Sequence, residues 1–217
     1  MSTRMKIDFV SDVACPWCAV GLNALQQALA RVGDEVEVYL RFQPFELNPG
    51  MPAEGQDAVE HLVEKYGSTP EQIRQNGKAI TDRGAELGFR FDMAKRSNIY
   101  NTFDAHRLLH WAGELGQAQQ LALKKALFAA YFTDGRNVSD PAELLRVVDE
   151  TGLDVETARL VLASDQYAAE VRSQEAFFMG QGIRAVPAVV INDRHLISGG
   201  QPVEVFERAI RQIAAQA

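Results

Sequence analysis

Residues 5–18, MKIDFVSDVACPWC, decide the fold, because a β-prone segment runs directly into two cysteines. Behind the cysteines, apolar side chains spaced 3, 4 and 3 residues apart predict a helix that ends at Gly33; they are Leu22, Leu25, Leu29 and Val32. Residues 35–45 then alternate apolar and polar side chains, which predicts a strand. The chain therefore opens with a β-α-β unit.

A long helical block follows a loop at residues 44–52 that is interrupted by prolines and a glycine. Helical spacing and capping residues predict helices over residues 57–66, 70–87, 101–115, 118–132, 141–150, 155–163 and 165–181. Glycines separate most of these segments. The middle of the chain is therefore predicted to be all helical.

The pattern returns to β after Gly182. Residues 186–191 form a nearly continuous apolar run that suits a strand buried on both faces, and residues 195–198 pair with it as a hairpin. A last helix follows Pro202. We expect an α/β fold of the form β-α-β … β-β-α, in which residues 1–52 and 182–217 build one domain and residues 53–181 are an inserted helical subdomain.

The charge of the chain and the length of its apolar segments argue against several classes of function. The 217 residues carry 29 acidic and 22 basic side chains, a formal charge of −7, and contain no run of three basic residues. Binding of nucleic acid or an anionic membrane needs a clustered basic surface, so we expect neither partner. The N-terminus has no apolar core of a signal peptide and no segment is long enough to span a membrane, so we expect a cytoplasmic protein. The sequence gives no indication of the oligomeric state.

The chemistry of the chain is carried by Cys15-Pro16-Trp17-Cys18, its only two cysteines. At the N-terminus of a helix, free backbone N–H groups and the helix dipole stabilise a thiolate, so Cys15 is predicted to be the nucleophile. Cys18, one turn further, is predicted to be the resolving thiol. Pro16 suits the first helical position because it needs no N–H partner there.

Two other interpretations of these cysteines are open. They are either inert buried side chains or half of a zinc site completed by a pair such as His106 and His110, four residues apart on one helix. A CxxC held between a strand and a helix is poorly shaped for a tetrahedral zinc knuckle, so we expect no metal and favour a redox dithiol.

Val186-Pro187 is the second element of interest, because a proline that opens a buried strand removes one hydrogen bond of the sheet. Either it marks a strand end, or it forms a cis-proline loop opposite the dithiol that leaves the Val186 backbone free to pair with a substrate.

These motifs resemble the DsbA-like branch of the thioredoxin superfamily. More specifically, SDVACPWCAVG, PFELNPGMP, NTFDAHRLLHWA and VPAVVINDRHLISGGQP resemble the FrnE-type cytoplasmic oxidoreductases, over residues 5–213 and in the family's order. The resemblance implies a thioredoxin-like fold and a protein-disulfide oxidoreductase or isomerase that exchanges disulfides with protein or small thiol substrates.

The resemblance also implies roles for single residues. Cys15, Cys18 and Pro187 are expected to be catalytic, with Pro187 as the cis-proline. We name as substrate-binding candidates the residues of the dithiol loop, the proline loop and the helix expected over the groove: Pro16, Trp17, Val186, Asn101, His106 and Arg107. No bound cofactor is implied, and glutathione is a candidate redox partner.

The chain departs from exported DsbA proteins in its dipeptide, which is Pro-Trp where strongly oxidising members have Pro-His. Trp17 offers a hydrophobic face instead of hydrogen-bond donors, so we expect Cys15 to be less acidic and the pair to be a weaker oxidant. Among the remaining charged residues, we expect Asp8 and Asp12 to be solvated loop or strand-end acids rather than a proton relay, and Arg184 to be a surface arginine.

Two alternative functions remain. The first is a glutathione-dependent enzyme: kappa-class glutathione transferases and 2-hydroxychromene-2-carboxylate isomerases share the inserted helices and bind glutathione, but typically have a serine where Cys15 stands. The second is a non-catalytic holdase with a thioredoxin fold.

Overall fold

The computed structural model describes residues 3–216 and contains a four-stranded mixed sheet in the order β2-β1-β5-β6. The strands are β1 (Thr3–Ser11), β2 (Val36–Pro44), β5 (Ala188–Ile191) and β6 (His195–Ser198). β1 runs parallel to β2 and antiparallel to β5, and β5 and β6 form the hairpin. The predicted β-α-β and β-β-α units thus share one sheet, whose two halves come from opposite ends of the chain.

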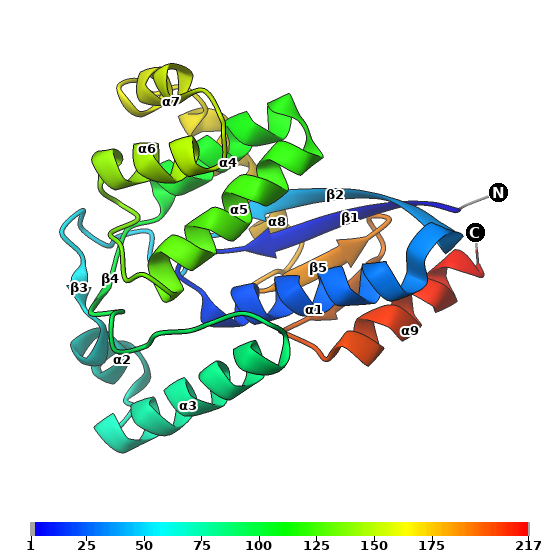
Figure 1. The fold of residues 1–217 in the computed structure, drawn as a ribbon, viewed down its shortest axis with the longest axis horizontal. Helices are drawn as coiled ribbons and strands as arrows, with labels where there is room; N and C mark the ends of the chain where they lie inside the picture. Colours follow the sequence, from blue (N-terminus) through cyan, green and yellow to red (C-terminus); the bar gives the residue numbers. More distant parts are fainter. Residues whose placement is uncertain (1–2, 217) are drawn as a thin grey trace.

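Helices cover both faces of this sheet (Figure 1). The terminal units contribute α1 (Pro16–Val32), a short 3₁₀ helix (Gly33–Glu35) and α9 (Val203–Ala214). α1 and α9 lie side by side on one face, over the buried side chains of Met5, Ile7 and Phe9. Val10 points to the other face, where it packs with Phe178 of α8 (Ala168–Gly180). The alternation of β1 therefore divides its side chains between two layers of helices.

The inserted segment is helical, as predicted. It contains α2 (Ala58–Tyr66), α3 (Pro70–Glu86), α4 (Phe103–Leu115), α5 (Gln117–Phe132), α6 (Pro141–Glu150), α7 (Val155–Leu162) and α8. Two short strands, β3 (Gln56–Asp57) and β4 (Asn98–Ile99), pair within it. One hydrophobic core runs from α1 through the sheet into α4, α5 and α6, so the insertion shares its core with the terminal units.

Two helix starts were predicted too early. α4 begins at Phe103 rather than residue 101, because the Asn101 side chain accepts a hydrogen bond from the Phe103 N–H at 2.9 Å and occupies the turn before the helix. α8 begins at Ala168 rather than residue 165, because Tyr167 has a left-handed backbone with φ of 64°. In both places a local turn takes precedence over helical spacing.

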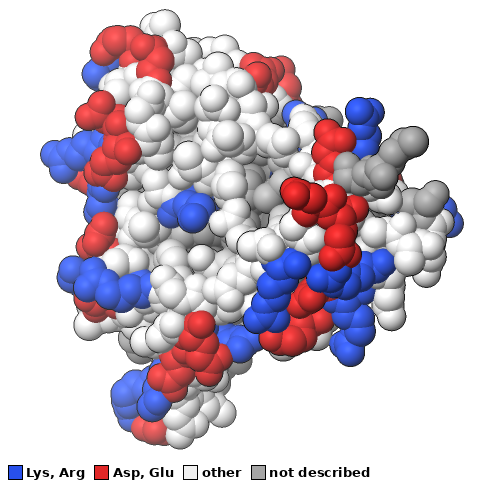
Figure 2. Space-filling model, turned by 45° about the vertical axis from the view of Figure 1, so that its right-hand side comes forward, with Lys and Arg blue, Asp and Glu red and all other residues white. Residues whose placement is uncertain are grey.

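Charged side chains are interspersed on the face that Figure 2 shows, where Lys and Arg neighbour Asp and Glu. Arg31 at the end of α1 contacts Glu204 at 3.0 Å, and Arg211 of α9 pairs with Glu35. Among the described helices, none is long and apolar enough to cross a membrane.

Candidate active site

The dithiol lies at the junction between β1 and α1. Cys15 is the N-cap residue of α1 with an extended backbone, and Pro16 occupies the first helical turn, as predicted. The Cys15 N–H donates to the Asp12 carbonyl at 3.2 Å, and the Cys18 N–H donates to the Cys15 carbonyl at 3.1 Å. Cys15 is 4% exposed and Cys18 is fully buried. The first thiol therefore lies at the positive end of the helix and the second lies behind it.

The proline loop faces the first thiol. The Val186–Pro187 peptide bond is cis, and the Cys15 S–H donates to the Val186 carbonyl across 3.6 Å. A Cβ on Gly21 would lie 3.1 Å from Cγ of Pro187 and 3.4 Å from Cα of Gly200. The absence of a side chain at Gly21 is what lets α1 approach the proline loop so closely.

Burial and charge set the acidity of Cys18. Burial raises its pKa well above the ordinary value, and the neighbouring Cys15 raises it further, whereas the positive charge of Lys124 and a backbone hydrogen bond of Asp12 lower it. Cys18 is therefore a protonated thiol at neutral pH, and it must lose its proton to act as a nucleophile.

Lys124 belongs to α5 of the inserted segment, and its positive charge acts on Cys18. Its side chain is fully buried, and its ammonium has no hydrogen-bond partner among the described residues. Nζ lies 4.8 Å from the ring centroid of Phe128. Burial lowers the pKa of Lys124 to about 8, although the charges of Cys18, Asp12 and Cys15 favour its protonated form. The lysine therefore exchanges its proton much closer to neutral pH than a surface lysine does.

Asp12 is buried, contrary to the prediction of a solvated acid. Its carboxylate accepts the N–H of Leu47 at 2.7 Å and of Ala14 at 3.2 Å, which ties the loop before Cys15 to the loop after β2. His106 Nε2 lies 3.5 Å from Asp12 Oδ1. Burial raises the pKa of Asp12, but His106 and the hydrogen bonds from Leu47 and Thr102 together outweigh it, and the net pKa lies below the ordinary value. Asp12 therefore remains ionised.

Asp8 is also buried, because its carboxylate is paired inside the sheet. It contacts Lys6 at 3.0 Å and accepts a hydrogen bond from Gln43 at 2.6 Å. The prediction of solvated acids was wrong for Asp8 and Asp12 alike, since both have partners that lie far away in sequence.

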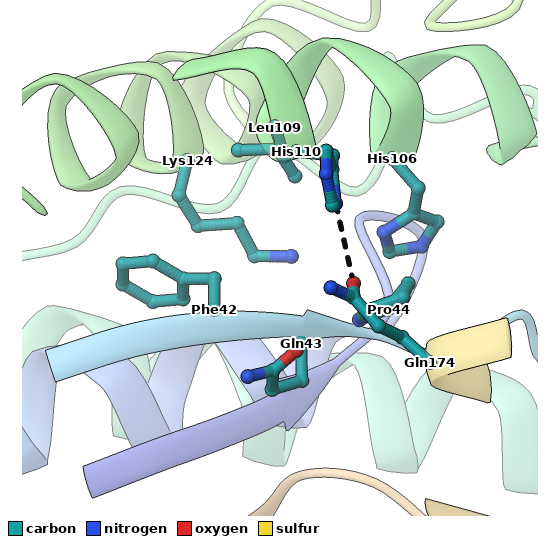
Figure 3. A pocket seen from close by; sticks show the side chains of 8 residues that line it. All are labelled: Phe42, Gln43, Pro44, His106, Leu109, His110, Lys124 and Gln174. Atoms are coloured by element: carbon teal, nitrogen blue, oxygen red, sulfur yellow. Dashed lines mark hydrogen bonds between the residues drawn. The ribbon is translucent and has the colours of Figure 1, made fainter. Parts of the chain in front are cut away.

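A water-sized cavity adjoins Lys124 between α4, β2 and α8. It has about 10 Å³ of space, close to the minimum for one water molecule. Its lining consists of Phe42, Gln43, Pro44, His106, Leu109, His110, Lys124 and Gln174. Figure 3 shows the Lys124 side chain extending from its helix into the space between the helices and β2, toward the side where His106 and His110 lie. His110 hydrogen-bonds to Gln174 at 3.4 Å near the outer wall.

Two further buried carboxylates belong to Glu46 and Glu175. Arg172 of α8 bridges Glu46 and Glu175, and its guanidinium carbon lies 3.8 Å from the ring centroid of Phe103. Burial raises the pKa of both glutamates despite the arginine. This cluster holds the loop after β2, to which Leu47 also belongs, against α8.

Exposed aromatic side chains flank the buried thiols. Trp17 is 41% exposed, and its backbone and ring lie against Gly200. Tyr66 is 59% exposed, and partial burial together with the charge of Cys15 raises its pKa. Apolar surface is thus available next to Cys15.

The hydrogen bonds of Asn101 and Arg107 go to residues outside the dithiol loop. Asn101 donates to the Met51 carbonyl at 2.9 Å and lines a hollow of about 180 Å³ with Asp104 and Ser139. Arg107 is buried, and its hydrogen bonds go to Asp104 and to carbonyls at the α7–α8 connection, including that of Gln166 at 2.9 Å.

Arg184 donates to carbonyls at the end of α8, those of Met179 and Ile183. The structure therefore brings together Cys15, Cys18, Val186 and Pro187, with His106 reaching them through Asp12. Arg107 and Arg184 connect chain segments instead.

Sequence reasoning missed Lys124 and Gln120. Both lie in a helix whose Lys124-Lys125 pair resembles a solvated stripe, yet Lys124 is buried and Lys125 is exposed. The available signal was spacing, since Lys124 lies four residues from both Gln120 and Phe128, on the same helix face as Leu127 and Tyr131.

Comparison with known proteins agrees with this geometry. Residues 6–211 match the model of the DSBA-like thioredoxin domain. YwbO of Bacillus subtilis (strain 168), an uncharacterized protein, is 28% identical over 211 residues, which cover 97% of this chain and 96% of YwbO.

Two solved structures are similar over nearly the whole chain. The probable DsbA oxidoreductase SCO1869 from Streptomyces coelicolor has a TM-score of 0.91 and 35% identity, over 98% of this chain and 91% of that one. The cytosolic disulfide reductase DsbM from Pseudomonas aeruginosa, solved with GSH, has a TM-score of 0.66 and 16% identity, over 96% and 98%. At that identity the second likeness shows the fold alone. The thioredoxin-like fold with a helical insertion is confirmed.

Proposed function

The chain belongs to the DSBA-like thioredoxin domain family, and we propose that its Cys15–Cys18 pair exchanges disulfides with protein or small thiol substrates. The observation that carries this proposal is the position of the Cys15 thiol, at the N-terminus of α1 and 3.6 Å from the carbonyl that precedes Pro187. Family membership supports an oxidoreductase activity, and the two thiols make disulfide exchange the specific reaction that we propose.

The proposed reaction runs in two displacements. The Cys15 thiolate attacks one sulfur of a substrate disulfide, the substrate S–S bond breaks, and the first substrate thiol leaves. Cys18 then attacks the Cys15 sulfur of the mixed disulfide and releases the second substrate thiol. Two electrons pass from the dithiol to the substrate, and the reverse sequence oxidises a substrate dithiol. The chemistry needs no bound cofactor.

Substrate binding is proposed at the surface around Cys15. The exposed Trp17 ring offers apolar contact, and the Val186 backbone beside the thiol offers hydrogen bonds to an extended chain. Asn101, His106 and Arg107 remain candidates for the same groove, although the burial of His106 and Arg107 favours roles in holding the site.

The proposed redox partner is glutathione, in the cytoplasm. The structural neighbour DsbM was solved with GSH and is described as a cytosolic disulfide reductase, which makes glutathione the first small thiol to test. A weaker oxidant than exported DsbA suits a reducing compartment.

Reduction of insulin disulfides tests the proposal. We expect the wild-type protein to accelerate the reaction and Cys15→Ser to fall to the uncatalysed rate, because the nucleophile is lost. Cys18→Ala should instead accumulate a mixed disulfide at Cys15, detectable by mass spectrometry. A wild type without dithiol-dependent activity would support a holdase. Glutathione-dependent isomerase turnover that survives Cys18→Ala would support the isomerase alternative.

A further inference from the structure

Two buried glutamates that the reaction above does not use meet at a single atom of one arginine. Glu46 belongs to the loop after β2 and Glu175 to α8, and Oε2 of each contacts Nη1 of Arg172, Glu175 at 2.8 Å. The glutamate side chains are only 2% and 7% exposed, whereas Arg172 is half exposed. Two carboxyl groups therefore face one positive charge in a place that water barely reaches.

One arginine does not satisfy both carboxylates. Oε1 of Glu46 and Oε1 of Glu175 are buried and have no hydrogen-bond partner among the described residues. A proton on one carboxyl removes one of the two like charges and supplies a donor for the other carboxyl. Burial raises the pKa of both groups, and a hydrogen bond from Glu46 is among the influences on the pKa of Glu175. Such a bond between two carboxyl groups exists only when one of them is protonated.

The pair is connected to the dithiol by a short series of bonds. Glu46 is followed by Leu47, whose N–H donates to the Asp12 carboxylate at 2.7 Å. The same carboxylate accepts the Ala14 N–H at 3.2 Å, and the Asp12 carbonyl accepts the Cys15 N–H at 3.2 Å. A displacement of Glu46 therefore reaches the start of α1 through two residues of the chain and one charged hydrogen bond.

We propose that Glu46 and Glu175 share one proton at neutral pH, and that the protonated pair positions the loop after β2 and, through Leu47 and Asp12, the Cys15 thiol. The two glutamates are positioning residues, because they act through Asp12. The part that concerns Cys15 rests on the disulfide exchange proposed above, and the shared proton does not.

Raising the pH is expected to loosen this contact. Because the folded pKa of the pair lies above that of the unfolded chain, its contribution to stability is present at low pH and is lost as the pH rises through the folded pKa. Above that pH, two negative charges repel each other in one buried place. The hold of α8 on Glu46, and with it the bond between Leu47 and Asp12, should then weaken.

Other charged groups near the pair come from each element packed around it. They are Arg172 of α8, His106 and His110 of α4, Arg41 of β2, Asp12 before α1 and Lys65 of α2. In the described part of the chain, Arg172 is the only one of them within 4 Å of either glutamate carboxylate. The positive charge of His106 favours ionised Glu46, and the negative charge of Asp12 opposes ionised Glu175.

The test compares Glu175→Gln and Glu46→Gln with the wild type in urea unfolding between about pH 5 and pH 9, above the ordinary pKa of glutamate. Each variant leaves one carboxylate for Arg172 and removes the repulsion. Relative to the wild type, the ratio of folded to unfolded protein should increase with pH in both variants, by up to about tenfold per pH unit. Glu170→Gln, exposed on the same helix, is the matched control and should show no difference that changes with pH.

Infrared spectroscopy detects the shared proton itself. At neutral pH, the difference spectrum between the wild type and either glutamine variant should contain the carbonyl stretch of a protonated carboxyl group. This band should disappear at high pH and should be missing from the Glu170→Gln difference.

Two readouts follow the loop and the thiol. Hydrogen exchange of the Leu47 N–H, corrected for its intrinsic pH dependence, should accelerate in the wild type as the pair ionises and stay slow in Glu175→Gln. In a Cys18→Ala background, iodoacetamide alkylation of the 4% exposed Cys15 should accelerate over the same pH range, and Glu175→Gln should remove this added rise.

The outcomes separate the parts of the inference. A stability difference that does not change with pH, or one that appears in only one of the two glutamine variants, overturns the shared proton. Equal profiles of Leu47 exchange and Cys15 alkylation in the wild type and Glu175→Gln overturn the positioning role. A wild type that shows the infrared band but reduces no insulin would instead refute the proposed function and leave the pair in place.

Discussion

Asp12 connects the loop that precedes the dithiol with the loop that follows β2, through the N–H groups of Ala14 and Leu47. Because its folded-state pKa lies below that of the unfolded chain, the ionised carboxylate contributes stability above about pH 4. This contribution is lost as the pH falls through the folded pKa.

We predict that Asp12→Asn lowers the free energy of unfolding by about 1–3 kcal/mol at pH 7, since a buried N–H group loses a charged acceptor. The difference from the wild type should shrink below about pH 4, where the wild-type carboxyl also becomes neutral. Urea unfolding from pH 3 to 7 measures it, with the exposed Asp34→Asn as control. A difference that is constant over this range would contradict the assignment.

Some single residues of the site could be predicted from the sequence, and others could not. Cys15, Cys18 and Pro187 were identified because they belong to short motifs with a known chemical meaning. The burial of Asp12 and Lys124 was not foreseen, because it depends on partners from Leu47, His106 and the sheet that lie tens of residues away. Residue type carries no record of such contacts, and helical spacing indicates only that Lys124 shares a face with apolar residues of its helix.

At the scale of elements, α5 covers the edge strand β2. The Gln117 side chain accepts the Leu40 N–H at 2.9 Å, and the Gln120 side chain accepts the Phe42 N–H at 2.9 Å and donates to the Phe42 carbonyl at 3.2 Å. Two glutamines thus occupy the hydrogen-bonding groups that an open sheet edge would expose. This pairing holds the helix that carries Lys124 against the sheet.

We predict that Gln120→Leu lowers the free energy of unfolding by about 2–4 kcal/mol, because buried groups of Phe42 lose their partners. The exposed Gln119→Leu on the same helix should change it by less than about 0.5 kcal/mol. Urea unfolding monitored by circular dichroism provides both values. Equal effects of the two substitutions would show that the glutamine does not hold the edge.

The contact between α1 and the proline loop gives a second prediction at this scale. Gly21→Val places methyl groups where Pro187 and Gly200 lie, so we expect a loss of stability of about 1–3 kcal/mol and a marked loss of insulin reduction. Gly77→Val on α3 is the matched control, because only Met93, at 3.9 Å, lies near its Cβ position. An active and stable Gly21→Val variant would contradict the close approach.

Elements were predicted better than residues, for a physical reason. Amphipathic spacing, N-cap residues and glycines act within one or two turns, so most helix ends were placed to within one residue. The exceptions, at Asn101 and Tyr167, are turns decided by a side-chain hydrogen bond and a left-handed backbone. The contacts of α4, α5 and α8 with β2 were not predicted, since they depend on how the insertion folds back.

At the scale of the molecule, the terminal units and the insertion share one hydrophobic core. We therefore predict a single cooperative unfolding transition. The chain has one tryptophan in each part, Trp17 on α1 and Trp111 on α4, so Trp17→Phe and Trp111→Phe each leave one local fluorescence probe. After correction for the stability of each variant by circular dichroism, both probes should follow the same transition. Separate fluorescence and dichroism transitions within either variant would indicate independent domains.

The central claim is that Cys15 and Cys18 form a reversible redox pair, and a glutathione redox titration tests it most directly. Trp17 fluorescence and counting of free thiols follow the reaction. We predict one two-electron transition, from a reduced protein with two free thiols to an oxidised protein with none. Its potential should be clearly more reducing than the approximately −120 mV of DsbA, because Trp17 stabilises the Cys15 thiolate less than a histidine does. A pair that does not cycle between these states would contradict the claim, and a potential equal to that of DsbA would contradict the role given to Trp17.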